Sequence, residues 1–357
     1  MTTVAEDIMD RTAPAEPQGL RATLVAPRHR DDPEWPWLTR VEPMSRFAFR
    51  RLYIDNVHPR LPKLSGPSRV WQLVRAARLT ADADVTFTFS TDIAIGLSSP
   101  PAGLVPRSRR IYVGFTQDGP WPDSRVARVG RAMRAYDAVS VFTDAERDIY
   151  LDRYGVAPDR MRVIPIHTDE SDGYRKYPDA PPRAEPYALA LGSPNRRFRP
   201  IAAACRDLGI PLIIMTRPTH RNDDLQELAD LGAEVITDAD RPRALTHLKH
   251  ARLATMVFDD PGLPGGYTTL VHAMFMQTPF VVTDCLGMRE HVVDGETGFV
   301  VPHGDDAMLA DAIERLWTDA DEARRFGAAA LTRARARHSL EAAAASFHAL
   351  AQDVVAR

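Results

Sequence analysis

The stretch over residues 264–305 decides the fold of this chain. It reads Pro264-Gly-Gly-Tyr-Thr-Thr-Leu-Val-His-Ala-Met-Phe-Met-Gln-Thr-Pro-Phe-Val-Val-Thr-Asp284 and continues Cys-Leu-Gly-Met-Arg-Glu-His-Val-Val-Asp-Gly-Glu-Thr-Gly-Phe-Val-Val-Pro-His-Gly-Asp305. The glycine pair opens an expected helix, which a buried strand, a short helix and another strand follow. Glycines at a helix start let the backbone approach a ligand and point free N–H groups and the positive dipole end at an anion. We therefore predict an anion site here, and a diphosphate is the obvious ligand.

Outward from this stretch, apolar runs rich in β-branched residues alternate with segments of helical spacing. The first half predicts strands at 20–27, 85–89, 111–115, 138–142 and 161–166, and helices at 70–79, 124–136 and 143–154, with residues 33–67 irregular. The second half predicts strands at 187–191, 211–216, 234–237 and 253–258, and helices at 196–208, 223–231, 241–250, 307–317, 321–337 and 340–355. Such alternation indicates α/β architecture with parallel sheets covered on both faces.

A polar segment rich in Asp, Tyr and Pro separates two series of this kind. We expect an N-terminal Rossmann-like domain over 1–170, a linker over 171–186 and a C-terminal Rossmann-like domain over 187–339. The last helix, within 340–357, is expected to pack back on the first domain. Two such domains are expected to hold a ligand in a cleft beyond the C-terminal ends of their strands.

Composition excludes several classes of protein. The 357 residues carry a formal net charge of −3, so no global basic field indicates nucleic acid as a partner. The two cysteines, Cys205 and Cys285, are too few and too far apart to predict a disulfide framework or a metal ribbon. No apolar run approaches the roughly eighteen residues that span a bilayer. The N-terminus is acidic and contains proline, unlike a signal peptide, so a cytoplasmic location is expected.

Several blocks of the sequence are matched in order by a known family. Tyr187-Ala-Leu-Ala-Leu-Gly192 is a strand that ends in glycine, Asn195-Arg-Arg-Phe198 is a basic segment after it, and Tyr154-Gly-Val-Ala-Pro-Asp-Arg-Met-Arg-Val-Ile-Pro165 closes the first half. Together with the tail from Gln277 onward, they resemble the GT-B glycosyltransferases of the retaining family-four type. The resemblance is strong over 185–337, weaker over 70–166 and nearly absent before residue 70.

This resemblance implies a fold and a reaction. The second domain is expected to bind a nucleotide-diphospho-sugar of the UDP or GDP type, and the first to bind the acceptor. The family needs no metal ion, and its donor phosphate helps to deprotonate the acceptor. The adjacent carboxylates Asp259-Asp260 and Asp31-Asp32 have no neighbouring ligands in the sequence, so no metal and no cofactor is expected.

The sequence departs from the family at positions that usually hold the donor. The family signature of Glu, seven residues and Glu falls on Pro264 and His272. The first Glu usually holds sugar hydroxyls and the second the ribose, for which an imidazole still offers a hydrogen bond. The family's histidine in the first domain is also missing, and Thr116, Gln117 and Asp118 occupy that loop. The sequence therefore leaves the sugar open.

Residue types and resemblance together give the expected site. Arg196 is expected to neutralise the diphosphate leaving group, because transfer without a metal must stabilise that charge electrostatically. Asp118 is expected to contact a sugar hydroxyl or to act near the acceptor. The donor-binding residues are expected to be Gly192, Ser193, Arg196, Arg197, Arg217, Gly265, Gly266, Tyr267, Thr268, Thr269, His272 and Glu290.

Each of these residues also has a plainer structural interpretation. A glycine pair makes ordinary turns, two arginines fit a solvated helix start, and His272 fits a satisfied core position. Arg217 fits an exposed surface, Asp118 a turn, and Glu290 the cap of a short helix. The basic stretches over 69–78 and 107–110 offer contact with an anionic membrane or acceptor, and we interpret them as solvated faces.

The sequence therefore predicts an enzyme that transfers a sugar from a nucleotide-diphospho-sugar with retention of configuration. A small molecule, a saccharide or a lipid is the expected acceptor, in specialised-metabolite or cell-surface glycan synthesis. One alternative is a binding protein that keeps the fold and has lost catalysis, as the two replaced glutamates suggest. Another is a nucleotide-sugar epimerase, whose chemistry needs acid and base carboxylates in the cleft.

Overall fold

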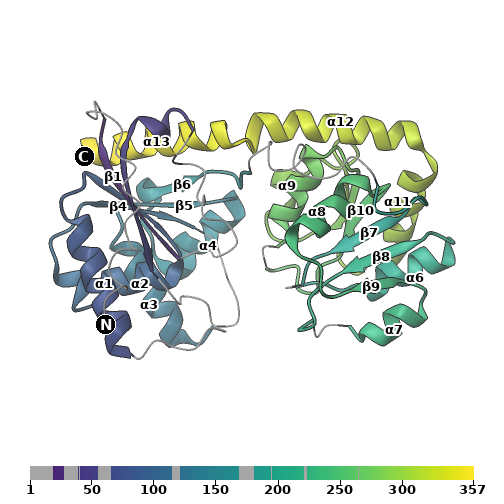
Figure 1. Cartoon of the computed structure of the whole chain (residues 1–357), viewed down its shortest axis with the longest axis horizontal. Coiled ribbons are helices and arrows are strands. Elements are labelled where there is room, and N and C mark those ends of the chain that lie inside the picture. Colours follow the sequence, from purple (N-terminus) through teal and green to yellow (C-terminus); the bar gives the residue numbers. More distant parts are fainter. Residues whose placement is uncertain are drawn as a thin grey trace. The chain divides into compact units, whose positions relative to one another are not determined.

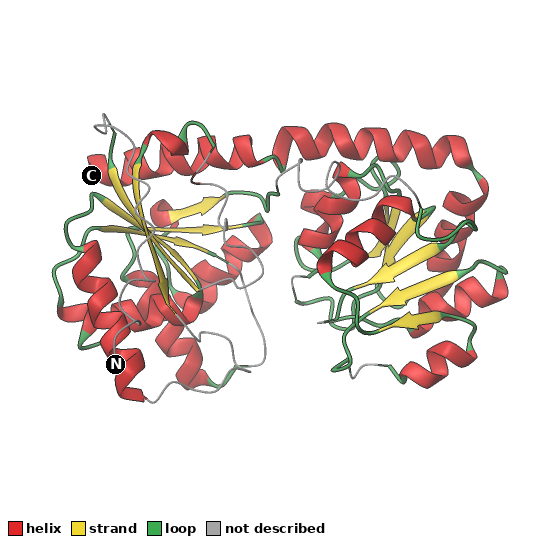
Figure 2. Cartoon of the chain, in the orientation of Figure 1, coloured by secondary structure: helices red, strands yellow, loops and turns green. Residues whose placement is uncertain are grey.

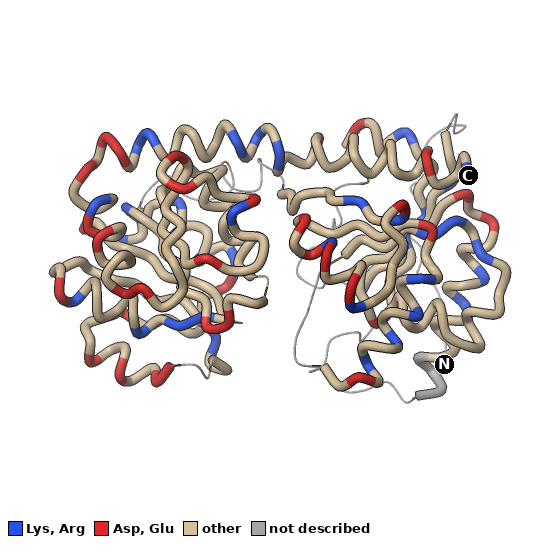
Figure 3. The backbone as a smooth tube through the Cα atoms, turned by 180° about the vertical axis from the view of Figure 1, so that it is seen from behind, with Lys and Arg blue, Asp and Glu red and all other residues tan. Residues whose placement is uncertain are grey.

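The computed structural model describes residues 19–27, 39, 41–54, 66–114, 121–168, 181–193, 195–220, 223–263 and 265–357. The chain forms two compact units (Figure 1). Unit 1 comprises Met1–Pro165 and Leu340–Arg357, and unit 2 comprises Ile166–Ser339. Charges of both signs are spread along the backbone of each unit (Figure 3). Along the described part of the chain, no helix has the length and apolar character needed to cross a membrane.

Unit 1 is built on a parallel six-stranded sheet with the order β2-β1-β3-β4-β5-β6. The strands are β1 (Arg21–Pro27), β2 (Ala48–Ile54), β3 (Val85–Phe89), β4 (Arg109–Val113), β5 (Ala138–Val141) and β6 (Met161–Val163). The α-helices are α1 (Gly66–Thr80), α2 (Thr91–Ser98), α3 (Asp123–Arg134), α4 (Asp144–Tyr154) and α13 (Leu340–Ala356). Helix α13 returns from the far end of the sequence to this sheet, where Phe347 meets Phe87 with ring centroids 6.3 Å apart.

Unit 2 has a second parallel six-stranded sheet, with the order β12-β11-β10-β7-β8-β9. Its strands are β7 (Ala188–Leu191), β8 (Leu212–Met215), β9 (Glu234–Ile236), β10 (Leu253–Met256), β11 (Phe280–Thr283) and β12 (Phe299–Val301). Its helices are α6 (Arg199–Asp207), α7 (Leu225–Asp230), α8 (Arg241–His250), α9 (Tyr267–Phe275), α10 (Met288–His291), α11 (Asp306–Thr318) and α12 (Ala320–Arg337). Figure 2 shows helices packed around both sheets, and the predicted α/β architecture is confirmed.

Local sequence explains where several of these helices begin. Thr143 caps α4, because its hydroxyl accepts from the Glu146 N–H at 3.1 Å, and the Glu146 carboxylate reaches back to accept from the Phe142 N–H at 2.8 Å. In unit 2, Asp240 caps α8 and Asp305 caps α11 through their side chains. Strands β7 and β8 read as continuous apolar runs because both faces of the sheet are covered.

Two expectations about the elements are wrong. Residues 33–67 include β2, an edge strand in which Arg50 and Arg51 interrupt the apolar run. Helix α1 also begins within this range. The helix expected from residue 196 begins at Arg199 instead, with Phe198 as its N-cap and proline in its first turn. Asp223 fixes that start, since its carboxylate accepts from the N–H groups of Phe198 and Arg199 at 2.8 and 3.1 Å.

Candidate functional site

The site is built where the strand order of unit 2 reverses direction. From β7 the chain proceeds to β8 and β9 on one side, and it returns on the other side with β10, β11 and β12. Loops that follow two such neighbouring central strands leave in opposite directions and open a crevice at the C-terminal edge of the sheet. The predicted Gly192 follows β7, and the predicted pair Gly265 and Gly266 follows β10. The two glycine segments therefore meet at this switch point.

Arg196 connects the two glycine segments. Its side chain is buried, with 4% of its surface exposed, and its Nε lies 3.3 Å from the Leu191 carbonyl oxygen. Its guanidinium carbon lies 4.5 Å from the centroid of the Phe258 ring, a cation–π contact. Burial lowers the pKa of Arg196 to about 10, so the group is still a cation at neutral pH. A positive charge is thus held in the floor of the switch point.

The glycines are needed because Arg196 and Phe258 fill the space beside them. A Cβ on Gly192 would lie 2.9 Å from Arg196 Nε, and a Cβ on Gly266 would lie 2.9 Å from Arg196 Nη2. The same Cβ on Gly266 would lie 3.0 Å from the Phe258 ring, and Gly266 has a φ of +72°. Both glycines therefore keep the backbone close to the guanidinium, and both adopt a positive φ that side chains disfavour, +120° at Gly192 and +72° at Gly266. We call Gly192, Arg196, Gly265 and Gly266 the glycine cradle.

Helix α9 starts from the glycine cradle. Gly266 is its N-cap, no side chain caps the first turn, and no acidic residue lies there. The first N–H groups of a helix have no partner within the helix and carry the positive end of its dipole. Tyr267 is buried and its hydroxyl donates to the Leu286 carbonyl, whereas Thr268 is exposed and Thr269 is half-buried. The start of α9 thus presents backbone donors and two threonines.

Three residues outside the predicted donor-binding set lie against the cradle. Asn195, with a φ of +52°, donates from Nδ2 to the Asp260 carbonyl at 2.9 Å and accepts from the Asp260 N–H at 2.7 Å. This reciprocal pair ties the loop after β7 to the loop after β10. Cys285 is buried beside Arg196 and Gly265, and burial raises the pKa of its thiol to about 12. Asparagine's tolerance of a positive φ was the available signal for the first of them.

A row of three tilted rings within unit 2 starts at Tyr267, the first residue of α9. The Tyr267 and His291 ring centroids lie 4.5 Å apart, and those of His291 and His338 lie 5.2 Å apart. His338 Nδ1 lies 2.8 Å from the carbonyl oxygen of Ile166, the first residue of unit 2. Burial, reinforced by their mutual repulsion and by neighbouring arginines, lowers the pKa of His291 to about 3, and burial lowers that of His338 to about 4. Both rings are therefore neutral near pH 7.

The other predicted donor residues differ in how exposed they are. Arg197 is half-exposed and pairs with Asp259, with 3.6 Å between Nε and Oδ1. Arg217 is exposed in the turn after β8, and Ser193 is half-buried in the loop after β7. His272 lies in the middle of α9 with 3% of its surface exposed.

Two further predicted residues stand apart. Glu290 is half-buried in α10, and its carbonyl accepts from Arg333 Nη2 at 2.7 Å. Asp118 lies outside the described residues. Within the described ranges, no group of three or more His, Cys, Asp or Glu side chains is placed to hold a metal ion.

The sequence profile of one family matches the part of unit 2 that carries this geometry. The profile of the family described as "Glycosyl transferases group 1" matches residues 196–319, which begin at Arg196 and include both the glycine pair and α9. The chain has a GT-B fold, and residues 196–319 are similar to the group 1 glycosyltransferases. The resemblance read from the sequence is thereby confirmed.

Two curated relatives are similar to this chain in sequence. Both are named D-inositol 3-phosphate glycosyltransferase, one from Stackebrandtia nassauensis and one from Nocardia farcinica. The first is 27% identical over 241 residues, which cover 61% of this chain and 54% of the relative. The second is 28% identical over 240 residues, which cover 61% and 53%. The matched part thus spans about half the length of these relatives.

Solved structures of other proteins share the GT-B fold of this chain. Sucrose-phosphate synthase from Thermosynechococcus elongatus superposes with a TM-score of 0.74 at 16% identity, covering 94% of this chain and 99% of that one. HepE of Anabaena in complex with UDP-glucose superposes with a TM-score of 0.73 at 15% identity, covering 93% and 99%. At these identities the likeness establishes the fold.

Proposed function

We propose that this chain is a glycosyltransferase that binds a nucleotide-diphospho-sugar at the glycine cradle and transfers the sugar to a hydroxyl acceptor with retention of configuration. The convergence of Arg196 on both Gly192 and Gly266, at the switch point of unit 2 and at the start of α9, carries this proposal. A backbone without side chains, a buried cation and a helix N-terminus together fit a diphosphate. The group 1 domain match and a structural neighbour with bound UDP-glucose support the same ligand class.

The proposed chemistry places the charge where the cradle neutralises it. The bond between the anomeric carbon and the β-phosphate oxygen breaks, and the acceptor oxygen forms its bond to the same face of that carbon. The acceptor proton passes to the departing phosphate oxygen, so no side-chain base is needed. Arg196 and the start of α9 stabilise the nucleoside diphosphate that leaves, and fixed charges of this kind contribute several kcal/mol to such a step. The proposed reaction uses no metal ion.

We assign the donor to unit 2 and the acceptor to unit 1. The Pro264 and His272 replacements fall on the family positions that usually hold sugar and ribose hydroxyls, so the donor sugar is expected to differ from the common hexoses in its hydroxyl contacts. A UDP-sugar is the first donor to test, because a structural neighbour carries UDP-glucose.

Calorimetric titration tests the proposal. UDP-sugars and GDP-sugars are titrated into the full-length protein, and one of the two nucleotide classes is expected to bind with a stoichiometry of one. Nucleotide release is then measured with a pool of cell-extract acceptors. Release of nucleotide supports the enzyme, whereas binding without release supports a protein that has kept the fold and lost catalysis. Absence of binding by every donor of both classes contradicts the proposed function.

A further inference from the structure

A second feature lies in unit 1, on the solvent-facing side of α1. The described part of the chain has four large apolar side chains that are strongly exposed: Val70 at 44%, Trp71 at 60%, Leu104 at 78% and Met308 at 47%. Scattered exposed apolar residues are normal, but three of these four lie on α1 and on the short 3₁₀-helix η3 (Ala102–Leu104), which pack against each other. Exposed apolar residues that cluster in this way indicate an interaction surface, which a single exposed residue does not.

The outward face of α1 combines these apolar groups with positive charge. Val70, Trp71, Val74, Arg75 and Arg78 line one shallow surface hollow, and they recur at the three- and four-residue spacing of a single helix face. We call these five residues the α1 face. The helix contains no Asp or Glu, although the whole chain carries a net charge of −3. Apolar and cationic side chains are therefore concentrated on one face of a helix that has no acidic residue of its own, in a unit whose charges are otherwise mixed (Figure 3).

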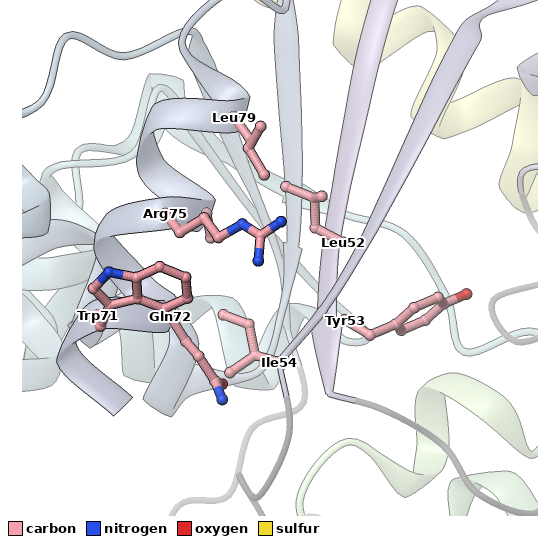
Figure 4. Close-up of a pocket in the computed structure, with 8 residues that line it drawn as sticks. Leu52, Tyr53, Ile54, Trp71, Gln72, Arg75 and Leu79 are labelled. Atoms are coloured by element: carbon pink, nitrogen blue, oxygen red, sulfur yellow. The ribbon is translucent and has the colours of Figure 1, made fainter. Parts of the chain in front are cut away.

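The recess behind this face is too small for a soluble ligand. It lies between α1 and β2, where the Arg75 guanidinium points toward Leu52 and Ile54 (Figure 4). Its volume of about 20 Å³ holds about one water molecule. Arg75 also lies over the Trp71 ring, with 5.5 Å between its guanidinium carbon and the ring centroid. The recess therefore admits no ligand, whereas the hollow over the α1 face has a volume of about 800 Å³ and opens to solvent.

We propose that the α1 face is a docking surface for an anionic lipid bilayer. Indole rings and aliphatic side chains partition into the headgroup boundary of a bilayer, and the exposed Arg78 beside them can reach the phosphates of acidic lipids. The aliphatic Val70, Val74 and Leu104 favour a lipid surface over a nucleic acid, whose recognition uses stacking and phosphate contacts. The proposal replaces our interpretation of residues 69–78 as a solvated face. It does not depend on glycosyl transfer, because the α1 face belongs to unit 1 and the glycine cradle to unit 2.

Vesicle flotation of the full-length protein tests this proposal. The two vesicle types are phosphatidylcholine alone and phosphatidylcholine with roughly 30% phosphatidylglycerol, at low and at high salt. The protein is expected to float with the acidic vesicles at low salt, and to be released from them by salt. It is expected to remain unbound with the neutral vesicles.

Matched variants locate the contact. Arg75→Glu with Arg78→Glu is expected to lower the partition coefficient at least roughly tenfold. Arg128→Glu with Arg131→Glu makes the same charge change at two exposed arginines of α3 with the same spacing, and it is expected to leave the partition within about twofold. Trp71→Ala is expected to lower partitioning several-fold, whereas Met308→Ala in unit 2 is expected to leave it unchanged. Thermal melting and nucleotide titration of each variant confirm that the fold and the cradle are intact.

Three outcomes overturn the proposal. The first is an absence of flotation with acidic vesicles. The second is an equal loss in both double-glutamate variants, which reports overall charge instead of a defined face. The third is retention of a labelled single-stranded RNA through the α1 face with no vesicle binding, which identifies a nucleic-acid surface instead.

Discussion

The switch points of the two sheets differ in how the following helix begins. In unit 1 the switch point lies between β1 and β3, and α2 starts directly after β3 with Asp92 in its first turn. In unit 2 it lies between β7 and β10, and α9 starts after the glycine pair with no acidic residue in its first turn. A carboxylate in the first turn satisfies the helix dipole from within the chain. Helix α9 has no such carboxylate, as the proposed diphosphate site requires.

The side chains around the two helix starts follow the same division. In unit 1, Ser90 precedes α2 with a φ of +124°, and the Thr91 hydroxyl lies 2.8 Å from the Tyr112 hydroxyl. In unit 2, glycines and a buried arginine take the corresponding place. Polar side chains at a helix start suit neutral hydroxyl partners, whereas bare backbone beside a cation suits a diphosphate. One fold thus supplies two chemically different switch points, and we expect the nucleotide only at the second.

The largest expected effect comes from adding a single methyl group to the cradle. Gly266→Ala is expected to lower donor affinity by at least roughly 2 kcal/mol, because its Cβ would meet Arg196 and Phe258 and displace the backbone that approaches the diphosphate. Gly295→Ala is the matched control, since Gly295 has the same φ of +72° and no atoms within 4 Å of its Cβ position. Calorimetry and thermal melting are measured for both. Similar affinity losses in the two variants would show that backbone strain, and not the contact with Arg196 and Phe258, causes the loss.

The second comparison concerns the two adjacent arginines. Arg196→Ala is expected to weaken donor binding and slow transfer by roughly 1 to 3 kcal/mol, because a desolvated charge-assisted contact is lost. Arg197→Ala is expected to cost less than about 1 kcal/mol, since Arg197 is half-exposed and already paired with Asp259. Steady-state kinetics of folded variants measure both effects. Unchanged kinetics in Arg196→Ala would reject its role.

Acid is expected to destabilise unit 2 more than unit 1. The pKa of His291 is about 3 and that of His338 about 4 in the folded chain, against about 6.5 when unfolded. The unfolded chain therefore binds these protons first as the pH falls below about 6.5. The stability of unit 2 is then expected to decrease, by at most about 1.4 kcal/mol per pH unit for each histidine. Above that pH both states hold neutral rings and the effect vanishes.

Hydrogen exchange at about pH 7 and about pH 5 measures this difference unit by unit. Protection in unit 2 should fall more than protection in unit 1, and His291→Phe should reduce the difference. An identical loss of protection in the two units, or no change in the variant, would show that His291 and His338 do not control the stability of unit 2 in acid.

The smallest expected effect concerns His272. If its imidazole contacts the ribose, His272→Ala should weaken donor binding by about 1 kcal/mol, and His272→Glu should retain affinity. If His272 only packs inside α9, where 3% of its surface is exposed, the alanine variant should lower the melting temperature and leave affinity unchanged. Measuring both quantities on each variant distinguishes the two roles, and a stability loss alone would remove His272 from the donor site.

The sequence was most informative where local chemistry and tertiary position coincide. The glycine pair predicts that a helix begins there, and α9 does begin after Gly266, because glycine at a helix start has a backbone reason in any fold. The start predicted for α6 at residue 196 was wrong. The hydrogen bonds between Asn195 and Asp260 and the capping by Asp223 that set its true start come from loops distant in sequence. Strand β2 was missed because an edge strand tolerates arginines that interrupt an apolar run. The burial of Arg196 under two glycines follows from the strand order, which residue spacing does not encode.

A crystal structure of the chain with a UDP-sugar or GDP-sugar tests the central claim most directly. We predict that the diphosphate lies against Gly192 and Gly266, with its oxygens facing Arg196 and the first N–H groups of α9. A diphosphate bound at the switch point of unit 1, beside Ser90 and the start of α2, would contradict the assignment of the nucleotide to unit 2.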